Sequence, residues 1–281
     1  MIRDLSITVL VENTSTRPGL ASEHGLALWI EADAHRILLD TGAGACLLPN
    51  ADALGIDLHS ADALVLSHGH CDHSGAVAEV LDRCDHLPVY YHPDALMPRF
   101  SARHGTPRRI GMPTDAIRAL SRCDARPQAG VQNIRPGIWC TGEIPRSPDL
   151  QPNDPMLFSN AGCTIPDPLR DDQALVIDTI AGLLVISGCC HAGIGPTLRH
   201  VHRLQPERPI LALIGGLHLK ACSPDEAQRH IRQIHEHGVG QVLAGHCTGN
   251  TAEALLAAES GCSFAPLRCG DHWRLKGETF A

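Results

Sequence analysis

Aromatic residues and long apolar runs are scarce in this sequence. Its 281 residues include only 4 Phe, 3 Trp and 2 Tyr. No apolar run approaches the roughly 20 residues that a membrane-spanning helix needs. The first 11 residues are too few and too polar for a secretory signal, and their alternation predicts a strand. We therefore expect a cytoplasmic protein without a membrane partner.

Positive charge is limited as well. The chain has 23 Lys and Arg residues against 31 Asp and Glu, which gives a net charge of −8. Lys and Arg residues do not cluster into a basic stripe, so we do not expect nucleic acid as a partner. With 43% hydrophobic and 19% charged residues the composition is that of a soluble globular chain. We expect a small-molecule substrate as partner, and the sequence predicts no oligomeric state.

Cysteine and histidine are abundant. Twelve cysteines without a secretory signal indicate a reducing compartment, in which thiols stay free or bind metal. Cys189 and Cys190 are adjacent, which is a poor start for a disulfide framework. Several of the 18 histidines stand beside glycines at the ends of apolar runs. This placement suggests ligands for a metal ion.

Short aliphatic runs that end in Gly, Ser, His or Asp predict a layered α/β fold. Strands are expected at residues 5–11, 26–31, 36–40, 63–66, 88–91, 174–178, 183–187, 210–214 and 241–244. Helical spacing is found at residues 74–84, 224–237 and 251–260. Strands covered by helices predict packed layers. Residues 97–172 are rich in Pro, Arg and Gly, and we expect this irregular stretch to shape a pocket.

The strongest local signal lies in residues 67–75, Ser-His-Gly-His-Cys-Asp-His-Ser-Gly. On an extended segment, residues two apart point the same way, so His68 and His70 can hold one ion. Asp72 and His73 are neighbours where a helix begins, and their diverging side chains suit a second ion. Two ions about 3.5–4 Å apart are a recurring hydrolytic arrangement. A polar loop with satisfied histidines is the less favoured interpretation.

Histidines follow three later strands. In residues 187–193, His191 is a predicted metal ligand, and Cys189 is either a further ligand or a small apolar filler. His246 is predicted as a ligand, and His218 as a supporting group or substrate contact, since the carboxyl ends of strands carry the sites of open α/β sheets. Asp40 ends a buried strand and is expected to orient a ligand histidine.

Other histidines carry weaker signals. His24 is a minor candidate for the site. The remaining candidates are interpreted as surface or helix-face residues: His92, His104, His200, His202, His230, His235 and His237. Three basic residues, Arg108, Arg109 and Lys220, are candidate contacts for an anionic substrate group, although solvated surface charges are the favoured interpretation.

Together these motifs resemble the metallo-β-lactamase superfamily, from Leu5 to Arg268. The element His68-x-His70-x-Asp72-His73 is its specific signature, and Asp40-Thr41-Gly42 and Gly245-His246 occur in the expected order. The resemblance implies an αβ/βα four-layer sandwich in a single domain over residues 1–281, with residues 97–172 as an irregular insertion. It also implies one or two divalent metal ions between the sheets. Zinc is favoured, with iron and manganese as alternatives.

Further motifs resemble the dihydropteroate-synthase-like branch of this superfamily. That branch includes the 7,8-dihydropterin-6-methyl-4-(β-D-ribofuranosyl)aminobenzene-5′-phosphate synthases. The resemblance rests on residues 23–25, 141–146, 188–191, 215–218 and 245–249.

Two positions depart from the superfamily pattern. Where a metal-binding histidine usually precedes the strand at 174–178, this sequence has Asp171, Asp172 and Gln173. The usual bridging aspartate is replaced by Cys189, or by His191 two residues later. The third ligand of the first site and the bridge between the ions therefore stay open.

Three functions compete. The first is a hydrolase that uses metal-activated water on an ester, lactone or phosphate ester. In it Asp72 would anchor the water, and His218 or Asp40 would assist proton transfer. The second is a transferase that joins a dihydropterin to an aminobenzene partner, implied by the resemblance alone. The third is a non-enzymatic metal or redox sensor that uses the thiols.

Overall fold

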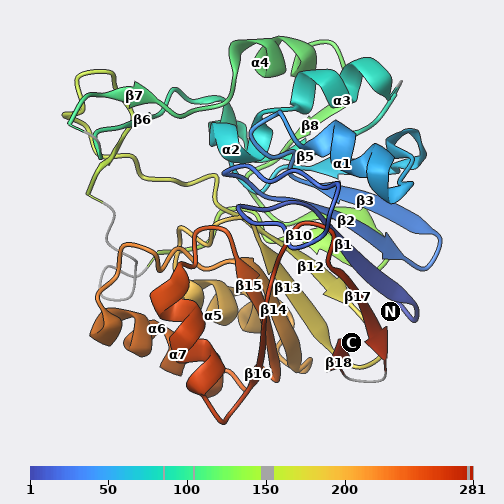
Figure 1. Ribbon diagram of the computed structural model, residues 1–281, viewed down its shortest axis with the longest axis vertical. Coiled ribbons are helices and arrows are strands. Elements are labelled where there is room, and N and C mark those ends of the chain that lie inside the picture. Colours follow the sequence, from blue (N-terminus) through green and yellow to red (C-terminus); the bar gives the residue numbers. More distant parts are fainter. Residues whose placement is uncertain (85, 104, 147–154, 277–278, 281) are drawn as a thin grey trace.

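Two large sheets form the centre of the molecule. The computed structural model describes residues 1–84, 86–103, 105–146, 155–276 and 279–280, and Figure 1 shows their arrangement. The first sheet has the strand order β18 (Thr279–Phe280), β17 (His272–Lys276), β1 (Leu5–Val11), β2 (Ala27–Ala32), β3 (His35–Leu39), β4 (Ala63–Val65), β5 (Val89–Tyr91) and β8 (Ala125–Pro127). Strands β3, β4, β5 and β8 run parallel, so the loops that follow them leave the sheet at one edge.

The second sheet contains the strands of the C-terminal half. Its order is β16 (Ser263–Pro266), β15 (Gln241–Gly245), β14 (Ile210–Gly216), β13 (Leu183–Ser187), β12 (Ala174–Asp178), β10 (Ile138–Cys140) and β9 (Gln132–Arg135). The predicted strands β12 and β13 pair as an antiparallel hairpin. Strands β13 to β16 are parallel. The loops after β13, β14 and β15 therefore meet at the same edge, where the candidate ligands were expected.

Apolar side chains fill the space between the sheets and cover both outer faces. Ile37 of the first sheet and Ile186 of the second belong to one fully buried central cluster. The outer face of the first sheet packs against α1 (Leu47–Leu54), α3 (Val77–Arg83) and α4 (Thr114–Leu120). That of the second packs against α5 (Ile194–Leu204), α6 (Pro224–Glu236) and α7 (Asn250–Ala258). This is the predicted αβ/βα four-layer sandwich (Figure 1).

Helix α6 shows how local sequence sets these elements. Ser223 and Glu226 form a capping box at its start, which typically contributes about 1 kcal/mol. The apolar residues Ala227, Ile231 and Ile234 face the sheet and are fully buried. Past its end, Gly238 adopts a left-handed φ of 67°, a conformation that glycine takes without steric cost. Predicted start and end are both confirmed to within one residue.

Residues 97–172 are less irregular than the sequence suggested. They contain α4 and the sheet strands β8, β9 and β10. A separate small sheet is formed by β11 (Leu157–Phe158), β6 (Phe100–Ser101) and β7 (Arg108–Arg109). Residues 147–154 and His104 lie outside the described residues. The single-domain organisation stays a prediction, which the pairing of β1 with β17 from the other end of the chain supports.

In the described part of the chain, two short 3-10 helices complete the elements, η1 (Leu58–Ser60) and η2 (Pro93–Leu96). The helix predicted at 74–84 is shorter in the structure: α3 begins at Val77, and Ser74 is the last residue of a separate short helix, α2 (Cys71–Ser74). None of the helices in the described part of the chain is sufficiently long and apolar to cross a membrane.

Candidate metal centre

The loop after β4 carries the first ligand pair. His68 follows this strand and His70 is the N-cap of α2, and both rings are buried. Their nitrogens Nε2 of His68 and Nδ1 of His70 are 3.0 Å apart. Gly69 between them lies against η2, where an added Cβ would be 2.0 Å from the carbonyl oxygen of Ala95. A glycine is therefore needed for the loop to hold both rings together.

His191, from the loop after β13, completes the first group. Its Nε2 is 3.2 Å from Nδ1 of His70, and the donors of His68, His70 and His191 lie within 4.8 Å of one another. Burial, followed by repulsion from neighbouring histidines, lowers the pKa of His68 and of His191 well below the usual value. Neutral rings leave nitrogen lone pairs available, which is what a metal ion requires.

Asp72, His73 and His246 form a second group beside the first. Nε2 of His73 is 3.1 Å from Nε2 of His246. Oδ2 of Asp72 is 3.5 Å from that His246 nitrogen and 3.9 Å from the His73 nitrogen. His24 approaches from the exposed side, with its Nε2 3.3 Å from Oδ2 of Asp72. The weak candidate His24 therefore lies at the site.

Cys189 stands between the two groups. Its Sγ is 3.2 Å from Nε2 of His73, and it also lies within 4.8 Å of the His68 donor. Both residues that the sequence left as alternatives thus have a place. His191 supplies the third nitrogen of the first group, and Cys189 occupies the position between the groups.

Hydrogen bonds to the Nδ1 atoms of His73 and His246, on the side of each ring opposite Nε2, fix the orientation of these rings. Oδ2 of Asp40 is 2.7 Å from Nδ1 of His73. The same carboxylate accepts hydrogen bonds from the backbone N–H and the hydroxyl of Ser67. On the other side, Oδ1 of Asn13 is 3.0 Å from Nδ1 of His246. Such contacts direct the opposite ring nitrogen toward a metal ion.

The electrostatic field of the second group favours a cation. Burial lowers the pKa of His73, but the facing carboxylates of Asp40 and Asp72 outweigh burial and raise it to about 9. A field that stabilises a proton on Nε2 also stabilises a metal cation there. The residues present, with imidazole, carboxylate and thiol donors, therefore fit a transition-metal ion such as zinc.

The acidic residues that replace the usual histidine hold loops in place. Oδ2 of Asp171 accepts the backbone N–H of Gly69 at 2.7 Å, and Oδ2 of Asp172 accepts that of Ala192 at 2.8 Å. Both carboxylates are buried. They fix the loops of His68 and His191 without joining any of the ligand groups found among the described residues.

His218 was expected as a supporting group or substrate contact, and in the structure it belongs to another cluster of possible metal ligands. Together with Cys189 and Cys247 it forms a further group with donors within 4.8 Å. Sequence reasoning missed Cys247 and Asn13 as site residues. Cys247 directly follows His246, which was a usable signal, whereas Asn13 carried none.

One prediction for a histidine outside the site is wrong. His92 was expected at the surface, but its side chain is buried and accepts the backbone N–H of Asp94 at the start of η2. The backbone thus supplies a partner for Nδ1 of the buried ring. Arg108 and Arg109 are exposed on β7.

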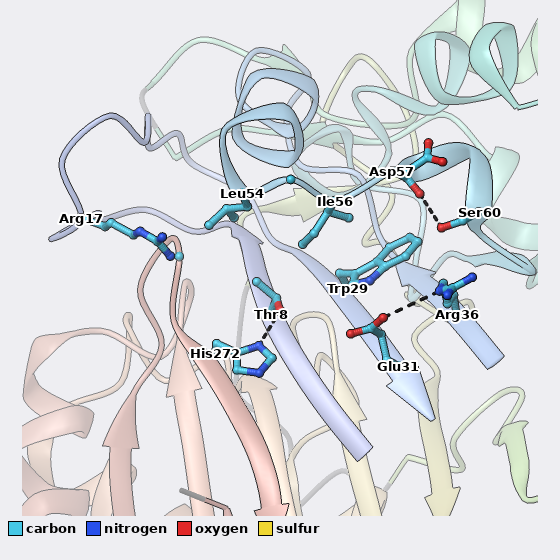
Figure 2. Close-up of a pocket in the computed structure, with 12 residues that line it drawn as sticks. Thr8, Arg17, Trp29, Glu31, Arg36, Leu54, Ile56, Asp57, Ser60 and His272 are labelled. Atoms are coloured by element: carbon cyan, nitrogen blue, oxygen red, sulfur yellow. Dashed lines mark hydrogen bonds and ion pairs between the residues drawn. The ribbon is translucent and has the colours of Figure 1, made fainter. Parts of the chain in front are cut away.

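A cavity of about 320 Å³ opens beside the candidate metal centre. His246 and Lys220 line it together with residues from the start of α7. A larger cavity of about 560 Å³ lies elsewhere, between β1, β2, β17 and the end of α1, with Trp29 on its wall (Figure 2). Its charged lining is partly self-paired, as with Glu31 and Arg36, and contributes no residue to the ligand groups. Of these two cavities, the smaller is the one that a residue of the ligand groups, His246, lines.

Comparison with known proteins agrees with this architecture. Residues 23–162 match the metallo-beta-lactamase superfamily. The chain is 28% identical over 261 residues to 7,8-dihydropterin-6-methyl-4-(beta-D-ribofuranosyl)-aminobenzene-5′-phosphate synthase of Methanocaldococcus jannaschii, which covers 89% of each chain. The resemblance to the synthase branch is thereby confirmed at the level of sequence similarity.

Solved structures show the same fold. Tm1679, described as a metal-dependent hydrolase of the β-lactamase superfamily, superposes with a TM-score of 0.82 at 28% identity and covers 95% of this chain and 98% of its own. The metallo-β-lactamase-fold protein YhfI from Bacillus subtilis has a TM-score of 0.58 at 14% identity and covers 97% of this chain and all of its own, which supports the fold alone. With its signature motif, its sandwich and these relatives, the chain belongs to the metallo-β-lactamase superfamily.

Proposed function

We propose that this protein is a metal-dependent hydrolase that acts on an ester, lactone or phosphate ester. The observation that carries the proposal is the convergence of two adjacent donor groups, one of three histidines and one of Asp72, His73 and His246. Divalent ions bound there, zinc in our proposal, would act as Lewis acids and bring the pKa of water near 7.

Within the group of Asp72, His73 and His246, Asp72 is the best candidate to meet an incoming water. Its side chain is 18% exposed, whereas that of His73 is fully buried and that of His246 is 1% exposed. Burial raises the pKa of Asp72, but the field of His73 and the other nearby histidines outweighs it, and the pKa stays below its ordinary value. The ionised carboxylate can therefore accept a hydrogen bond from water and hold it for attack.

Asp40 and His218 take different parts in this proposal. The carboxylate of Asp40 is fully buried and engaged by Ser67 and His73, so it positions His73 and does not reach substrate. The ring of His218 is only partly buried and packs on that of His191, with 4.2 Å between ring centroids. His218 is thus the better candidate for contact with substrate or for proton transfer.

The test is a substrate panel of generic carboxylic esters, lactones and phosphodiesters. We expect metal-dependent turnover of at least one class, lost in the His68→Ala/His70→Ala variant and retained in His202→Ala, which changes a histidine absent from the ligand groups. Turnover that persists in the double variant would contradict the proposal. Metal binding without any metal-dependent reaction would favour a sensor instead.

A transferase is the second candidate, favoured by the similarity to the Methanocaldococcus jannaschii synthase. In such a protein the donor groups would hold cations against a leaving diphosphate, and the reaction would join a dihydropterin to an aminobenzene partner. Incubation of the full chain with a pterin diphosphate and the aminobenzene ribofuranosyl phosphate tests this. Product from this pair, with none from the hydrolytic panel, would overturn the hydrolase proposal.

A further inference from the structure

Cys189, His218 and Cys247 form a cluster of possible metal ligands, and the thiol of Cys247 has no part in the proposed reaction. Their donor atoms lie within 4.8 Å of one another, and both thiols are buried. Each residue comes from a different loop, after β13, β14 and β15. The Sγ of Cys247 accepts the backbone N–H of His218 at 3.3 Å. Two sulfurs and an imidazole in one place are a donor set that binds zinc and other soft ions.

The backbone is shaped to bring these donors together. At Gly216 an added Cβ would lie 2.4 Å from the carbonyl oxygen of Gly188 and 2.7 Å from Sγ of Cys247. Only glycine leaves room there for the sulfur. His218 itself has a φ of 52°, a left-handed conformation that costs a non-glycine residue about 1 kcal/mol or more. Such strain persists only where the surrounding structure holds the residue in that conformation.

We propose that Cys189, His218 and Cys247 bind a soft divalent ion. Its position is next to, and distinct from, those of the two donor groups described above. Cys189 is the shared residue, because its Sγ also lies 3.2 Å from Nε2 of His73. Three protein donors leave one coordination position of a tetrahedral ion open. The centre therefore has a thiolate-rich end that selects zinc or cadmium over manganese or magnesium. The assignment goes beyond the proposed hydrolysis and does not depend on it.

The test is a cadmium titration of the full-length protein, purified under reducing conditions. Thiolate-to-cadmium charge transfer in the near ultraviolet reports sulfur ligation, and elemental analysis counts ions per chain. We expect the band in the wild type, and we expect Cys247→Ser to lose most of it together with one ion. His218→Asn, which keeps a residue that tolerates the left-handed region, should weaken cadmium binding. The His68→Ala/His70→Ala variant should keep the band.

Cys190→Ser is the matched control. Cys190 is equally buried in the same loop, but its Sγ faces the hydroxyl of Thr197 at 3.5 Å and belongs to none of the described ligand groups. It should leave band and ion count unchanged. An unchanged band and ion count in a folded Cys247→Ser protein, checked by circular dichroism, would overturn the proposal. So would recovery of a Cys189–Cys247 disulfide from the metal-loaded protein. Neither readout needs a substrate, so failure here is separate from failure of the hydrolase proposal.

Discussion

Asp40 shows how a single buried carboxylate determines the state of a candidate ligand. It accepts two hydrogen bonds from Ser67 and contacts Nδ1 of His73 at 2.7 Å, which leaves Nε2 of that ring directed at His246 and Cys189. The ring therefore presents one defined nitrogen to a cation, and the negative charge behind it adds to the ligand's basicity.

Replacing Asp40 by Asn tests this arrangement. Asp40→Asn keeps the size of the side chain but removes the charge, so we expect metal affinity or turnover to fall about 10–100-fold. Metal affinity is measured by competition with a chromophoric chelator. Glu259→Gln is the control, since Glu259 forms a histidine–carboxylate pair with His235 at 3.1 Å outside the ligand groups. Equal affinities for Asp40→Asn and the wild type would contradict the positioning role.

The raised pKa of Asp172 leads to a prediction about how the stability of the fold depends on pH. Burial raises its pKa to about 6 from an ordinary 3.8. Below the ordinary value both folded and unfolded chains carry the proton, so its burial has no charge penalty there. Between pH 3.8 and about 6 the unfolded chain loses this proton while the folded chain keeps it, so stability falls across this window, by about 3 kcal/mol in all once the pH exceeds 6.

Asp172→Asn removes that charge and retains an acceptor for the backbone N–H of Ala192. In urea denaturation of the metal-free protein, the variant should gain stability relative to the wild type as pH rises from 4 to about 6.5. If the stability difference between Asp172→Asn and the wild type does not change across this window, burial of the Asp172 charge does not destabilise the folded chain.

At this scale the sequence revealed residues that are contiguous and missed those that meet only in three dimensions. His68, His70, Asp72 and His73 lie in one short segment, so their chemistry could be identified directly. Asn13 is an ordinary polar residue after β1, and its contact with His246 depends on how the first sheet faces the second. Nothing local encodes that contact.

At the scale of the elements, the candidate ligands lie in loops that follow strands, and close packing of the backbone holds these loops in place. Gly69 lies so near η2 that a Cβ would meet backbone atoms of Ala95, which cannot rotate away as a side chain would. We expect Gly69→Ala to displace His68 and His70, to destabilise the fold by about 1–3 kcal/mol and to weaken metal binding. Thermal unfolding and metal analysis measure both effects.

Gly240→Ala is the matched control for that substitution. There the nearest atom to an added Cβ is the carbonyl oxygen of Leu211 at 3.5 Å, an ordinary van der Waals contact. It should leave metal content unchanged. A Gly69→Ala protein with full metal content and wild-type stability would show that the loop does not require glycine.

The elements that were predicted have apolar patterns that are long or clearly capped, whereas helices such as α1, α4 and α5 were missed. The capping residue Ser223 and the apolar spacing located α6 almost to the residue. Strands β9 and β10 were missed as well, because β9 has a single apolar residue, Ile134, and β10 lies in the stretch that was expected to be irregular. Their pairing with β12 and with each other gives them their conformation, and this interaction is not local in sequence.

At the scale of the whole molecule, the two sheets bring together loops from both halves of the chain. His68 follows β4 of the first sheet, whereas His191 and His246 follow β13 and β15 of the second. Layered α/β packing was predictable from the alternation of elements, but the sheet to which each strand belongs was implied only by family resemblance. The centre therefore joins the sheets, and ions bound there should stabilise the entire fold.

Removing the ions tests that link. Ions that bind the folded chain and not the unfolded one add stability, by about 2.7 kcal/mol when their free concentration is 100 times Kd. We expect dialysis against a chelator to lower Tm by several degrees and added zinc to restore it. The His68→Ala/His70→Ala variant should respond less. A Tm that is independent of chelator and zinc would contradict a bound centre between the sheets.

The most direct test of the metal centre is anomalous scattering at the metal absorption edge from crystals of the metal-loaded protein. For the two donor groups the account predicts two neighbouring peaks, about 3.5–4 Å apart, in addition to any ion bound by Cys189, His218 and Cys247. One should lie among His68, His70 and His191, and the other among Asp72, His73 and His246. Crystals of protein loaded with zinc, iron or manganese that show no peak at these residues, with the rings directed away from one another, would contradict it.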